Sequence, residues 1–114
     1  MTNGQLEAVL GAMIDITQNR LPGALAWEIV KTKREVAEAL GTFMEARDGL
    51  IKSYGDGGAI SQDHENWPVF VVAFEELLQQ EVTIAGKIDI DRLIAANVEV
   101  KPDSLGLLDA VGLF

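Results

Sequence analysis

The chain of 114 residues contains no cysteine, a single histidine and half as many basic as acidic residues. Without cysteine it cannot form disulfides, thiolate zinc sites or a thiol nucleophile, so packing must supply its stability. Nine basic and eighteen acidic residues give a formal charge of −9 and a pI near 4.4. This balance disfavours direct binding to nucleic-acid phosphates at neutral pH.

Long apolar runs are also missing. No stretch approaches the roughly 18 unbroken apolar residues of a membrane span. The first 20 residues place no basic residue ahead of their apolar stretch and carry Glu7 and Asp15 within it, unlike a signal peptide. We therefore expect a cytoplasmic protein with no membrane partner.

The sequence does contain enough apolar residues, 48%, to form one core, and its length predicts a single domain spanning residues 1–114. Apolar residues recur at helical spacing and predict helices over about 3–18, 22–54 and 67–80. Pro22 suits the first turn of the second helix, where its missing N–H costs nothing.

The second predicted helix has an apolar stripe at seven-residue spacing, formed by Ile29, Val36, Phe43 and Leu50. The stripe fits either an ordinary core helix or an interface with a second copy of the chain. About 33 residues at about 1.5 Å rise would span roughly 50 Å, more than the roughly 34 Å diameter of a sphere of this chain length. Three outcomes are open: a kink near Gly41 or Gly49, an elongated molecule, or another chain that covers the projecting surface.

After residue 80 the periodicity changes from helical to alternating. The alternation predicts short strands, in which Val82 and Ile84 pair with Val98 and Val100, followed by a terminal helix that completes residues 81–114. The predicted fold is mainly α: a long antiparallel helical hairpin with a short N-terminal helix and a small β-containing tail, with an α+β class as the alternative.

The only histidine, His64, lies between Asp63 and Glu65 in the loop that joins the last two long helices. Adjacent residues point in different directions, and the acidic spacing does not match a calcium loop. The nearby GDGG of residues 55–58 lacks the lysine and the strand that a phosphate loop requires. We therefore interpret the stretch as an interhelical turn and predict no metal site and no cofactor.

No nucleophile and base stand out, so the sequence predicts a protein that is not an enzyme and has no catalytic residues. The acidic pairs Glu75–Glu76 and Asp89–Asp91 are typical of solvated helix faces or caps. Trp27 and Trp67 are expected in the core, with a role as interface anchors as the alternative.

Several stretches resemble a group of short, uncharacterised proteins encoded by tailed bacteriophages and prophages. The similarity is carried by LPGALAWEIV, EARDGLIKSYG, FEELLQQEVTI and KPDSLGLL, at residues 21–30, 45–55, 74–84 and 101–108. It implies a phage origin, a helical hairpin with a small β-containing tail, and a location in the host cytoplasm or in the virion. It carries over no catalytic residues, because none are assigned to such proteins.

These observations lead us to expect a non-enzymatic phage accessory or assembly protein that works through protein–protein contacts. We expect the chain to form a homo-oligomer through Ile29, Val36, Phe43 and Leu50. Another phage or host protein is the other partner that the sequence leaves open. The alternative is an acidic inhibitor of a host nucleic-acid-binding or defence protein, motivated by the charge of −9.

Overall fold

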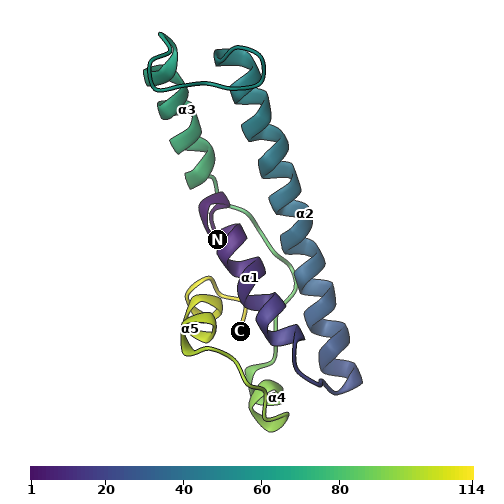
Figure 1. Ribbon diagram of the computed structural model, residues 1–114. Coiled ribbons are helices and arrows are strands. Elements are labelled where there is room, and N and C mark those ends of the chain that lie inside the picture. Colours follow the sequence, from purple (N-terminus) through teal and green to yellow (C-terminus); the bar gives the residue numbers. More distant parts are fainter.

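The computed structural model describes all residues, 1–114, and is built from helices alone (Figure 1). The mainly α class predicted from the sequence is confirmed, as are the three long helices to within a few residues. The elements are η1 (Asn3–Gln5), α1 (Leu6–Thr17), α2 (Gly23–Tyr54), α3 (Trp67–Gln79), α4 (Ile90–Ala95) and α5 (Pro102–Ala110).

Helix α2 runs without interruption through Gly41 and Gly49 and extends along the whole molecule. The molecule is therefore elongated, with principal extents of 55 × 22 × 21 Å and a radius of gyration of 17.2 Å. A compact chain of this length would have a radius of gyration of about 13 Å. Of the three sequence-based outcomes, elongation is the one observed, and the helix does not break at either glycine.

Two shorter helices, α3 and α1, lie end to end along α2 (Figure 1). Asn3 joins them: its backbone N–H donates to Gln80 O at 3.0 Å, and its side-chain amide donates to Leu77 O at 2.8 Å. These bonds satisfy carbonyls that the end of α3 would otherwise leave unpaired. The two stacked helices thereby form one nearly continuous column that runs antiparallel to α2.

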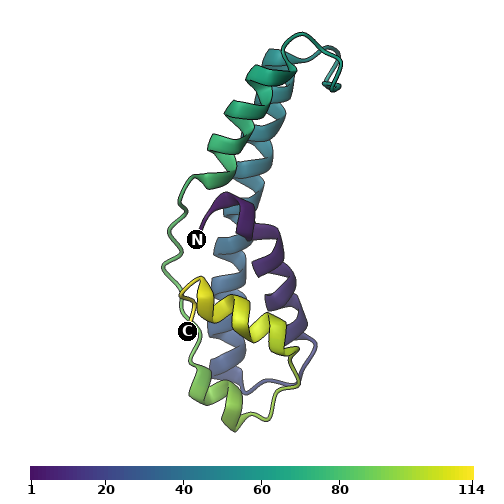
Figure 2. The same cartoon turned by 90° about the vertical axis from the view of Figure 1, so that its left-hand side faces the viewer.

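Only half of the molecule has a third layer. Residues 80–89 leave α3 as an extended segment, pass along α2 and lead into α4, while α5 packs against α1 (Figures 1 and 2). We call this half the body. Its core consists of twelve buried apolar residues: Leu6, Val9, Ala12, Met13, Ile16, Leu25, Ile29, Val36, Ile88, Leu93, Leu108 and Leu113.

The extended segment is fixed to α2 by polar side chains. The Glu35 carboxylate accepts the N–H groups of Ala85 at 2.8 Å and Gly86 at 3.1 Å. Gly86 lies so close to α2 that an added Cβ would sit 2.4 Å from Thr32 Oγ1. Only a residue without a side chain permits this approach.

The predicted pairing of Val82 and Ile84 with Val98 and Val100 is wrong. The structure contains no strand, and the extended segment makes one isolated bridge, between Thr2 and Glu81. Near residue 99 a side chain takes the place of a partner strand: the Asn19 amide exchanges two hydrogen bonds with the backbone of Glu99, at 2.9 and 3.0 Å. The alternating apolar residues still pack against the core, so their periodicity reflects half-burial without a sheet.

Helix α2 is long but heavily charged, and every other helix is shorter than a bilayer crossing requires, so the structure contains no candidate membrane span.

We predict that Gly86→Ala lowers the free energy of unfolding by about 1–3 kcal/mol, because the new methyl group would force the segment away from Thr32 and Glu35. Gly11→Ala is the matched control, since a Cβ there meets no atom within 4 Å. That change should stabilise α1 by up to about 1 kcal/mol. Urea unfolding of both variants checks the pair, and equal midpoints would contradict the close approach.

Candidate interaction surface

The other half of the molecule is a two-helix projection, which we call the arm (residues 40–79). It contains the end of α2, the loop of residues 55–66 and α3 (Figure 1). Of the fifteen buried residues in the chain, the arm contains one, Phe70. No third element covers the two helices (Figure 2).

Aromatic rings fill the space between the two arm helices. Phe70 lies 5.5 Å from Trp67 and 5.7 Å from Phe74, measured between ring centroids, and Phe74 lies 6.3 Å from Phe43. Such offset pairs add to the energy of burial. The rings hold α2 and α3 together, but most remain only partly buried.

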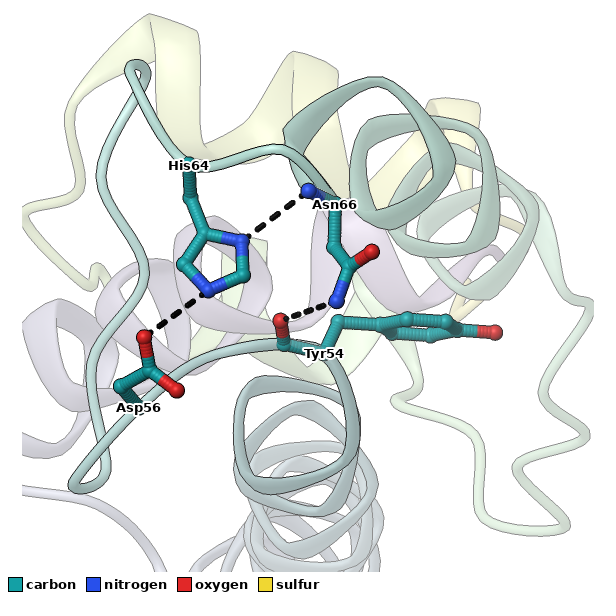
Figure 3. Close-up of polar contacts among 4 residues, drawn as sticks. All are labelled: Tyr54, Asp56, His64 and Asn66. Carbon is teal, nitrogen blue, oxygen red and sulfur yellow. Dashed lines mark hydrogen bonds and ion pairs between the residues drawn. The ribbon is translucent and has the colours of Figure 1, made fainter.

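The tip of the arm is closed by a chain of hydrogen bonds around His64 (Figure 3). The backbone N–H of Asn66 donates to His64 Nδ1 at 3.0 Å, so the ring proton lies on Nε2 and donates to Asp56 Oδ2 at 3.0 Å. The Asn66 side chain donates to Tyr54 O at 3.0 Å. His64 therefore ties the end of α2 to the start of α3.

The GDGG stretch forms the tight turn expected from the sequence. Asp56 and Ala59 exchange two backbone hydrogen bonds, at 2.9 and 3.1 Å. Gly57 and Gly58 both have positive φ, at 61° and 82°, the backbone conformation of a two-residue hairpin turn. The interpretation of this stretch as an interhelical turn is confirmed.

The four candidate interface residues fall into two environments. Ile29 and Val36 are fully buried in the body core, so within one chain they behave as ordinary core residues. Phe43 and Leu50 belong to the arm and are partly buried. Their seven-residue spacing places all four on one side of α2, but the neighbouring elements cover the first two fully and the last two only in part.

The two tryptophans also differ. Trp67 packs against Phe70, as expected for a core residue. Trp27 is 68% exposed on α2, so the core assignment is wrong for this residue. It lies between the buried positions Leu25 and Ile29 in sequence but points away from them, as residues two apart on a helix do.

The arm exposes apolar side chains of α3. Val69 and Val72 are 54% and 58% exposed, and together with Tyr54, Pro68, Ala73 and Glu76 they line a shallow hollow of about 440 Å³. Val69 directly precedes the buried Phe70, and Val72 follows it by two positions, so on a helix both side chains point away from the face that Phe70 buries.

The acidic pairs are distributed over separate elements. Asp89 caps α4, where its carboxylate accepts the N–H groups of Asp91 and Arg92, as the sequence indicates for one of the two residues. Glu75 and Glu76 lie on the exposed side of α3. No group of three His, Asp or Glu residues is arranged to hold a metal ion.

Comparison with known proteins found no matching family model, no curated relative and no similar solved structure.

We predict that His64→Ala loosens the tip, because the Asn66 N–H loses its acceptor and Asp56 loses its partner. The expected cost is about 1–2 kcal/mol, and it should appear as faster hydrogen exchange in the first turn of α3. Asp63→Ala, at an exposed neighbour in the same loop, is the control. Unchanged exchange in the His64 variant would show that the tip does not depend on the ring.

Proposed function

We propose that the protein is a non-enzymatic interaction protein that self-associates through its arm. The observation that carries the proposal is the incomplete core of the arm: one buried residue there, against fourteen in the body. A pair of helices in water rarely buries enough apolar surface to be stable alone. A second protein surface supplies the missing layer.

The exposed groups of the arm agree with a contact role. Val69 and Val72 present aliphatic surface in the first half of α3, with Glu75 and Glu76 close by in the sequence. A central apolar patch with charged surroundings is the usual arrangement of a protein interface.

The setting that we propose is that of a phage or prophage accessory or assembly factor, in the host cytoplasm or in the virion. This part of the proposal is supported by the sequence resemblance at residues 21–30, 45–55, 74–84 and 101–108. Another phage or host protein could use the same arm once the protein is assembled.

We predict that the chain forms oligomers and that Val72→Glu weakens their association at least about tenfold, which corresponds to about 1.4 kcal/mol. A charge at an interface centre must be desolvated, whereas at the exposed surface of the free chain it is tolerated. Val30→Glu is the matched control, because Val30 is an exposed valine of α2 in the body. Light scattering with size-exclusion chromatography over a concentration series gives the masses.

A parent chain that stays monomeric at every concentration would overturn self-association. An oligomer that Val72→Glu and Val30→Glu weaken equally would show that the arm is not the contact surface.

Salt provides a second test. The arm contains seven acidic and two basic residues, a formal charge of −5, so two arms in contact repel each other. Raising the ionic strength from about 0.01 to about 0.15 M shortens the Debye length from roughly 30 to roughly 8 Å. We therefore predict tighter self-association at the higher salt concentration, measured by sedimentation equilibrium. Dissociation on adding salt would indicate an interface held by opposite charges elsewhere on the chain.

A further inference from the structure

We infer that the arm binds the arm of a second copy in antiparallel orientation, along one defined side of α2, with the two-fold axis near Gly49. The paired arms form a four-helix bundle, and the two bodies point in opposite directions. This inference rests on the self-association proposed above.

The side of α2 in question can be followed along the helix. Glu28, Thr32 and Glu35 contact the extended segment: Glu28 accepts the N–H of Asp89, Glu35 accepts those of Ala85 and Gly86, and Thr32 lies against Gly86. The same alternation of three- and four-residue steps continues along one helix face. We call this face the flank; its members are Glu28, Thr32, Glu35, Ala39, Thr42, Ala46, Gly49 and Ser53.

Coverage of the flank stops halfway. A hollow of about 280 Å³ lies where the extended segment leaves α3, lined in part by Ala39, Thr42, Ala46 and Val82. Beyond it, residues 80–89 no longer accompany α2 (Figure 2). At Gly49 an added Cβ would meet no atom within 4 Å. The arm part of the flank is therefore open surface, although the body part is filled.

The surface area indicates a second copy as the occupant. The chain exposes 7223 Å², about 1,100 Å² more than the roughly 6,100 Å² expected for a compact monomer of its mass, 12.3 kDa. A standard protein interface removes about 800 Å² from each partner. One such contact would bring the exposed surface of each chain close to that of a compact protein.

The position of the extended segment decides the orientation. It lies on the flank in the body, so two copies with their bodies at the same end would meet segment against segment. Two extended chains are about 10 Å thick together, which would hold the arms apart. In the antiparallel arrangement each body lies beyond the tip of the other arm, and the helices can approach to the usual 8–10 Å between axes.

The first test blocks the flank without disturbing the single chain. Gly49→Leu adds a large side chain to open surface, and Gly41→Leu adds the same side chain to open surface at a helical position outside the flank. Both remove a glycine from the interior of α2, so both should raise the melting temperature of a monomer. We expect Gly49→Leu to weaken dimerisation at least about tenfold, because the leucine prevents close approach of the helices, and Gly41→Leu to leave it unchanged.

The second test determines the orientation of the two arms by cross-linking. Because the chain has no native cysteine, each introduced cysteine is the only thiol in its protein. Ala46→Cys and Ser53→Cys proteins are mixed and treated with a short bifunctional thiol reagent. Antiparallel arms place residue 46 of one copy beside residue 53 of the other, so the mixed product should exceed both self-linked products. Mass spectrometry of the linked peptides identifies each species.

The outcomes separate the two proposals. A parent dimer that survives Gly49→Leu, or that gives mainly self-linked products, overturns the antiparallel flank pairing and leaves self-association standing. A parent chain that is monomeric throughout overturns the proposed function itself.

Discussion

The arrangement of the whole molecule depends on the junction at Asn3. This one residue is buried, and it gives one backbone and one side-chain hydrogen bond to carbonyls at the end of α3. Two helices from opposite parts of the sequence are thereby aligned into one rod along α2. Because the junction fixes where α3 ends, it also determines where residues 80–89 begin their course over the body.

The division into body and arm follows from that course. Glu35 and Gly86 hold the extended segment against α2 on one side of the junction, and nothing takes the corresponding place on the other. The proposed interface is therefore the continuation of an intrachain contact. A partner's helix would occupy along the arm the position that the chain's own segment occupies along the body.

Much of the helical layout could be predicted, because apolar spacing and turn residues are local signals. The bounds of α2 were anticipated to within a residue, and the glycine turn at residues 55–58 was recognised. The absence of a sheet in the tail could not be predicted, since Asn19 and Glu35 supply hydrogen-bond partners for its backbone groups from far away in the sequence. The heptad positions Ile29 and Phe43 look equivalent in sequence, and only the tertiary structure shows that the first is fully buried and the second only partly.

The separation of the two cores has a consequence for cooperativity. Phe70 and its aromatic neighbours share no member with the twelve buried residues of the body core. The two halves are linked by few contacts: the partly buried Phe43, which packs against both, the hydrogen bonds of Asn3 and the continuous backbone of α2. The arm is then expected to behave as a separate unit of local unfolding, with amides that open at lower free energy than those of the body. Association would raise that opening energy, because a partner binds the folded arm and not the opened one.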